Sequence, residues 1–99
     1  MNPTFDQDGY PTEETCQIIE KWVLKEPKDW YDLMEFVHEA WNYKNYFRVR
    51  GRFYRLATGG WSGNEDIISS LKTNYMFWGL CWHMSKRGGC HLFELPELK

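Results

Sequence analysis

The residues of this chain with the most chemical promise gather in two glycine-rich segments. The first reads GGWSGNE, residues 59–65, and leads into an apolar helical run. The start of a helix presents free amides and a positive dipole end, which attract anions. A glycine in the first turn, Gly63, lets another group come close to the backbone. The segment therefore predicts a pocket for a phosphate, a carboxylate or a nucleotide, lined by Trp61, Ser62, Gly63 and Asn64.

The second segment reads SKRGGCHLFE, residues 85–94, and predicts a hairpin turn at its glycine pair. If the strands bring the two segments together, Arg87 and His91 complete the same ligand site. A simpler account is that the basic residues keep an exposed turn soluble, and both interpretations stay open at this point.

A structural explanation of the first segment is also available. Ser62 and Glu65 have the spacing of a capping box, in which each side chain accepts a hydrogen bond from the other residue's amide. Under this interpretation the two residues only begin a helix. Gly63 and Trp61 would then be the residues left to indicate a function.

Metal binding and catalysis have weaker support. A hairpin turn of even length would place Cys81, His83, Cys90 and Glu94 on one face, although their spacing is not that of a usual zinc site. Whether the first three bind a metal stays open, and no cofactor is expected. The three histidines belong to no recognised nucleophile motif, so the residues argue against an enzyme without excluding one, and no catalytic residue is assigned.

The charges are divided unevenly along the chain. Residues 1–43 carry ten acidic and three basic side chains, whereas residues 44–99 carry four and nine. Glu35 and Glu39 are therefore expected to contact a basic surface of a partner protein. Four arginines, interleaved with aromatic residues, would suit single-stranded nucleic acid, but the isoelectric point of 5.9 argues against it. Salt bridges from these arginines to the acidic helices are the simpler expectation.

The pattern of apolar residues predicts one α+β domain over residues 1–99, with a flexible lead at residues 1–10. Residues 12–42 should form an acidic helical hairpin, with Thr12 and Asp29 as helix caps. Residues 44–96 should form a basic ββαββ unit with an antiparallel four-stranded sheet. Its expected elements are strands at 46–50 and 52–58, a helix at 63–72, a long strand at 76–85 and a last strand at 90–95.

Composition also restricts the cellular setting. The chain has no stretch of about 20 apolar residues, and its start lacks the apolar core of a signal peptide. Three cysteines are too few, and odd in number, for a disulfide framework. These features predict a protein of a reducing compartment such as the cytoplasm, with no membrane partner. They do not predict its oligomeric state.

Three stretches, DGYPTEET, TGGWSGNEDII and RGGCHLFE, resemble small uncharacterised proteins encoded by bacteriophages and prophages. The resemblance covers most of the chain and implies a bacterial cytoplasm as the setting. It implies no activity, but small phage accessory proteins often act by binding. We therefore expect a non-catalytic protein that inhibits a bacterial host or defence protein, and the alternative is a protein that binds or sequesters a nucleotide or another small anion.

Overall fold

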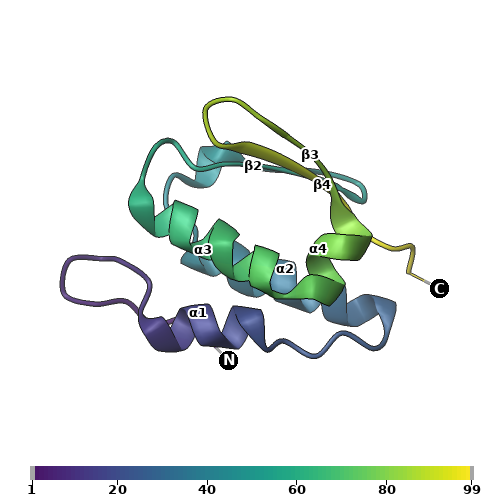
Figure 1. The fold of residues 1–99 in the computed structure, drawn as a ribbon, viewed down its shortest axis with the longest axis horizontal. Helices are drawn as coiled ribbons and strands as arrows, with labels where there is room; N and C mark the ends of the chain where they lie inside the picture. Colours follow the sequence, from purple (N-terminus) through teal and green to yellow (C-terminus); the bar gives the residue numbers. More distant parts are fainter. Residues whose placement is uncertain (1, 99) are drawn as a thin grey trace.

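The computed structural model describes residues 2–98 and confirms the α+β fold, with two α-helices and a short 3-10 helix before the first strand (Figure 1). Its four strands form one antiparallel sheet in the order β1-β2-β4-β3. The elements in chain order are α1 (Glu13–Glu20), α2 (Pro27–Ala40), the 3-10 helix η1 (Lys44–Tyr46), β1 (Phe47–Arg50), β2 (Phe53–Ala57), α3 (Ser62–Thr73), α4 (Tyr75–Cys81), β3 (Trp82–Lys86) and β4 (Cys90–Glu94).

The start of α1 follows the sequence prediction. Thr12 is its N-cap, and the Thr12 hydroxyl accepts from the amide of Thr15 at 3.2 Å. Residues 2–12 form a loop whose two arms meet in a bridge between Phe5 and Pro11. The mobility expected for residues 1–10 stays a prediction.

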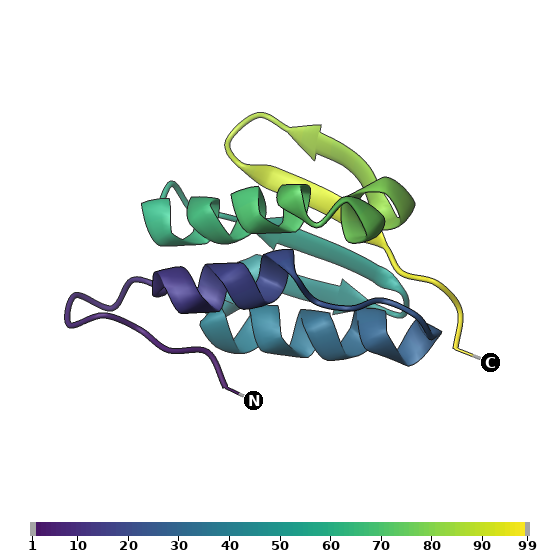
Figure 2. The same cartoon turned by 60° about the horizontal axis from the view of Figure 1, so that its bottom comes forward.

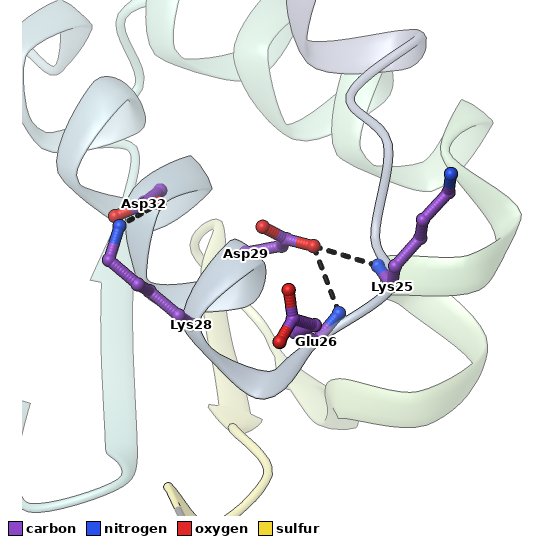
Figure 3. A network of polar contacts seen from close by, with 5 residues as sticks. All are labelled: Lys25, Glu26, Lys28, Asp29 and Asp32. Carbon is purple, nitrogen blue, oxygen red and sulfur yellow. Dashed lines mark hydrogen bonds and ion pairs between the residues drawn. The ribbon is translucent and has the colours of Figure 1, made fainter.

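The start of α2 differs from the prediction by three residues, because its N-cap is Glu26 and not Asp29. Pro27, whose fixed φ suits the first helical position, begins the helix, and Asp29 lies in its first turn. The Asp29 carboxylate accepts from the backbone amides of Lys25 and Glu26, each at 2.9 Å (Figure 3). These two hydrogen bonds stabilise the ionised carboxylate and lower the pKa of Asp29. Asp29 therefore supports the helix start from inside the helix.

The largest error of the sequence interpretation concerns the predicted strand at 76–85. Its first part is the helix α4, and only Trp82–Lys86 is a strand. Asn74 makes the difference, because its side-chain oxygen accepts from the Phe77 amide at 3.2 Å and caps the helix. Its amide also donates to the carbonyls of Ile19 and Trp22. A continuous apolar run does not distinguish a strand from a buried helix, and the cap decides here.

The helices all lie on one side of the sheet (Figures 1 and 2). α2 and α3 lie against the sheet, and α1 packs against α3 on the side away from it. The core between these layers contains Leu56 and Phe93 from the sheet and Leu33, Ile67 and Phe77 from the helices, each at most 1% exposed. The opposite face of the sheet is covered by no helix within residues 2–98. Over the same residues, no helix has the length and apolar character needed to cross a bilayer.

Candidate functional site

Trp61 is not a free platform for a ligand. One side of its ring lies on Gly63, where a Cβ atom would come within 2.3 Å of the indole. The Tyr10 ring stacks on Trp61 as well, with 5.1 Å between the centroids and only 10° between the planes. The glycine is thus explained by the close approach of a side chain from the same protein. The tryptophan joins the N-terminal loop to the start of α3.

The expected capping box of Ser62 and Glu65 is wrong. The N-cap of α3 is Trp61, no side chain caps it, and Ser62 is the first helical residue. The amide of Glu65 instead donates to the Trp61 carbonyl at 3.1 Å, which is an ordinary helical hydrogen bond. The helix begins one residue earlier than predicted, and at this start the Trp61 ring lies over Gly63 and Asn64 is buried.

Asn64 is fully buried and holds three backbone segments together. Its side-chain oxygen accepts from the amide of Asn42 at 3.0 Å. Its amide donates to the carbonyls of Asn42, at 2.9 Å, and Thr58, at 3.2 Å. These three hydrogen bonds use the oxygen and the amide within the protein, so Asn64 has a structural role at this position.

The two glycine-rich turns meet, as the pocket hypothesis requires. The Thr58 amide donates to the carbonyl of Gly89 at 3.0 Å, and the Thr58 hydroxyl accepts from the amide of Gly60. A Cβ atom on Gly89 would lie 2.3 Å from that hydroxyl, so the contact needs a glycine. The junction is filled by the buried Thr58 side chain.

Arg87 and His91 do not join Trp61. Within residues 2–98, no hydrogen bond, ion pair or ring contact connects either residue to it. Arg87 is exposed at the turn between β3 and β4. His91 instead lies beside Ser85, with 2.7 Å between Nδ1 and the hydroxyl oxygen, and near the ring of Trp78. The anion pocket at residues 59–65 stays a prediction, but internal contacts now account for Trp61, Gly63 and Asn64.

The Ser85–His91 pair has the distance of a nucleophile and its base. Trp82 Nε1 donates to the Ser85 oxygen at 2.9 Å, which leaves the serine hydroxyl to donate to the imidazole. Burial, and then the charge of Lys72, lower the pKa of His91 and favour the neutral ring. Within the described chain, however, no side chain hydrogen-bonds the other ring nitrogen to orient it. We therefore interpret the Ser85–His91 pair as a structural cross-strand contact between β3 and β4.

The four residues considered as possible metal ligands are separated by the fold. Cys81 is buried in α4, whereas His83 is exposed in β3, because the chain changes from helix to strand between them. Cys90 lies under Arg55, whose Nε donates to its sulfur at 3.3 Å. No three His, Cys, Asp or Glu side chains in the described residues are grouped to hold a metal ion. The expectation that the four residues share one face is therefore wrong.

A surface that sequence reasoning missed lies on the uncovered side of the sheet. The strand register places ten side chains there: Arg48, Arg50, Phe53, Arg55, Ala57, Met84, Lys86, Cys90, Leu92 and Glu94. We name the basic and large apolar residues among them the basic sheet face: Arg48, Arg50, Phe53, Arg55, Met84, Lys86 and Leu92. A shallow hollow of about 530 Å³ crosses it, lined in part by Arg48, Arg50, Phe53 and Leu92. Phe53 is 54% exposed, so an apolar ring stands among the arginines. Alternation of arginine with apolar residues in FRVR was the signal for this face.

The arginines do not pair with the acidic helices as expected, because the helices lie on the other side of the sheet. Within residues 2–98, Arg52 alone among the arginines forms an ion pair, and its partner is Glu94 at 3.1 Å. Arg48 and Arg55 stand directly opposite each other on neighbouring strands. Two like charges in this position repel, since no described carboxylate lies between them as a partner.

Glu35 and Glu39 lie elsewhere, on α2 near the edge strand β1. Both line a hollow of about 360 Å³ together with Phe47, Val49 and Tyr54. The two carboxylates are exposed and one helical turn apart. Their predicted contact with a basic partner surface stays a prediction.

Comparison of the chain with protein-family models, with curated proteins and with solved structures finds no match.

Proposed function

We propose that this protein acts without catalysis, by binding an acidic surface of another protein on the basic sheet face. The observation that carries the proposal is the opposition of Arg48 and Arg55 across β1 and β2. Like charges at directly opposed positions destabilise a sheet by a few tenths of a kcal/mol to about 1 kcal/mol. A carboxylate placed between the two guanidinium groups would turn this repulsion into two charge-assisted hydrogen bonds.

The neighbouring side chains favour a protein partner over a nucleic acid. Phe53, Met84 and Leu92 offer one aromatic and two aliphatic contacts, and Phe53 alone among these three can stack on a base. Arginine, methionine and aromatic residues are the types enriched at protein interfaces. The formal net charge of −2 is also far from the strongly basic balance of most nucleic-acid-binding domains.

The resemblance to phage and prophage proteins suggests where such a partner would be found. A bacterial host or defence protein with an acidic surface would be captured in the bacterial cytoplasm, and its own ligand would be excluded. The proposed outcome is inhibition by occupation of a surface. Electrostatic attraction would mainly raise the association rate and fix the orientation, while the apolar residues slow dissociation.

Affinity capture from bacterial lysate, followed by titration of the captured protein, tests the proposal. We expect saturable binding that weakens at least tenfold between 50 and about 500 mM salt, because exposed charges are screened. The double variant Arg48→Glu, Arg50→Glu should abolish it. The matched control Lys21→Glu, Lys25→Glu changes the net charge by the same amount on the helical side, where both lysines are exposed.

The controls separate the alternatives. Binding that survives reversal of Arg48 and Arg50, or that is lost equally in the lysine control, would contradict a role for the basic sheet face. Retention of a labelled single-stranded oligonucleotide at physiological salt, with no protein captured, would replace the protein partner with nucleic acid. Reversal of Glu35 and Glu39 to lysine tests the acidic helical face in the same assay.

A further inference from the structure

The short helix α4 exposes an uncommon amount of apolar surface. Tyr75 is 82% exposed, Met76 54% and Leu80 65%. At about 100° per residue, these three and Gly79 occupy one continuous arc of about 140° around the helix. We name these four residues the α4 face. Phe77 and Cys81 occupy the opposite side of the helix and are buried in the core.

Gly79 lies within this arc and nothing in the protein requires it. Its φ is not positive, and a Cβ atom placed there would meet no atom within 4 Å. Gly63 contrasts with it, since a ring of the same chain fills the space beside that residue. A helical glycine without an internal neighbour is explained when the backbone is approached from outside the molecule.

The low charge of the surroundings favours a second copy of the chain as the occupant. Residues 73–85 contain no Asp, Glu, Lys or Arg, so the α4 face carries no charge of its own. Near Leu80, the charges of Arg52 and Glu94 neutralise each other in an ion pair. A charge also lies over another residue of α4, because the Nζ of Lys72 is 5.5 Å from the ring centre of Trp78. A two-fold contact presents the same surface patch on both copies, so a patch of one charge repels its counterpart and an uncharged patch does not. The basic sheet face and the acidic helices fail this condition, whereas the α4 face meets it.

We propose that two copies of this chain associate through their α4 faces, with the two helices crossing at Gly79. The absence of a side chain there lets the helix axes approach closely, and Met76 and Leu80 of each copy cover the crossing. The exposed apolar area is on the order of 400 Å² per copy, about half of what a stable interface buries on each side. The dimer is therefore weak and reversible, with a dissociation constant in the micromolar range. The basic sheet face stays open in each copy.

Sedimentation equilibrium of the full chain between 1 and 300 µM tests this inference. We expect a reversible monomer–dimer equilibrium that Leu80→Glu shifts at least thirtyfold toward monomer, and Met76→Lys should act in the same direction. The matched control is Val23→Glu, which places the same charge at another exposed apolar residue and should leave the equilibrium unchanged. Thermal unfolding at 1 µM verifies that each variant folds.

Gly79→Ala gives the sharpest test, because its two effects have opposite signs. The added methyl should raise the urea midpoint of the monomer and weaken dimerisation at least tenfold. A wild-type chain that is monomeric at every concentration would overturn the inference. A dimer that persists in both Leu80→Glu and Met76→Lys would overturn it as well. If the wild type forms no dimer and these variants lose binding to a different protein, the α4 face binds that protein and the inference is wrong. Reversal of Arg48 and Arg50 should leave the dimer intact, which separates this test from that of the proposed function.

Discussion

At the scale of single residues, the two helical glycines make opposite predictions. Gly63→Ala should lower the free energy of unfolding by about 1 kcal/mol, because the new methyl displaces the Trp61 ring from its position against α3. Gly79→Ala, measured where the chain is monomeric, should raise it by about 0.5–1 kcal/mol, since the helix gains and nothing clashes. Urea denaturation compares both variants with the wild type.

A second readout connects the Gly63 result to its cause. The stacked Tyr10 ring should lose its ring-current shift in the NMR spectrum of Gly63→Ala, and should keep it in Gly79→Ala. Equal stability changes of the same sign in the two variants would show that helix propensity alone governs both positions. The assignment of Gly63 to the Trp61 contact would then be withdrawn.

His91 predicts how stability depends on pH. Its pKa in the folded protein is lowered from 6.5 by burial and by Lys72, so the unfolded chain takes up the proton first as the pH falls. The free energy of unfolding should therefore decrease as the pH falls below about 6.5, and His91→Gln should flatten this dependence between pH 7 and 5. The pKa of His38 is lowered as well, by burial and by Lys44, so part of the dependence should remain.

Urea midpoints of both proteins at pH 7, 6 and 5 measure the effect. Substitution of the exposed His83 by glutamine is the matched control for the removal of one imidazole. A profile of His91→Gln as steep as that of the wild type would show that protonation of His91 does not disturb its contact with Ser85.

At the scale of elements, Asn74 connects α1, α3 and α4. Asn74→Ala removes the cap of α4 and leaves the carbonyls of Ile19 and Trp22 without this donor, so it should cost about 2–3 kcal/mol. The amide of Phe77 should also exchange with deuterium much faster. Thr73→Ala, at the exposed neighbouring position, is the control and should change stability by about 0.5 kcal/mol or less. Similar losses in both variants would contradict a special role for Asn74.

Elements that depend on interactions between residues close in the sequence were predicted, whereas an element that depends on distant contacts was not. The buried face of α2 was predictable from spacing, since Leu33 and Val37 recur with the helical period. The strands β1, β2 and β4 were placed to within about a residue by their alternation and turns. α4 was missed because its cap residue owes part of its effect to carbonyls more than 50 positions away.

The same distinction explains the candidate site. The sequence analysis left Trp61 and Gly63 unexplained and placed Asn64 in the same predicted pocket. The partners of Trp61 and Asn64, which are Tyr10, Asn42 and Thr58, lie in other segments. Local spacing therefore suggested a ligand where tertiary contacts supply the neighbours. The β1 and β2 part of the basic sheet face needed only the alternation of these strands and the register of one tight turn. Met84, Lys86 and Leu92 join it through the pairing of β4 with β2 and β3. The face was overlooked because salt bridges to the helices offered an easier account.

At the scale of the whole molecule, the acidic first half and the basic second half of the chain place their charges on different sides of the fold. The acidic residues of α1 and α2 lie in the helical layer, and the strand register places Arg48, Arg50 and Arg55 on the opposite face of the sheet. Figure 2 shows the helices on one side of that sheet. Exposed charges farther apart than about 8 Å are largely screened at physiological salt. The two charged surfaces can thus act independently, and the small net charge conceals a molecule with two electrostatically different sides.

The cysteines test whether these layers unfold as one unit. Cys81 is 2% exposed between α4 and the sheet, and burial followed by Glu94 raises its pKa to about 12. Its thiol is therefore almost entirely protonated at pH 8, and the thiolate is the reactive form. Alkylation of Cys81 should require global unfolding, so the logarithm of its rate should rise with urea with the slope of the equilibrium transition.

Mass spectrometry of the alkylated chain resolves the three thiols in one experiment. Cys16 is half-buried in α1, so it should be modified sooner and with a weaker dependence on urea than Cys81. Agreement between the Cys81 slope and the transition followed by circular dichroism would mean that α4 is held until the whole core opens. A Cys81 rate that does not change with urea would mean that α4 detaches by itself. The exposed α4 face would then belong to an element that opens independently of the sheet.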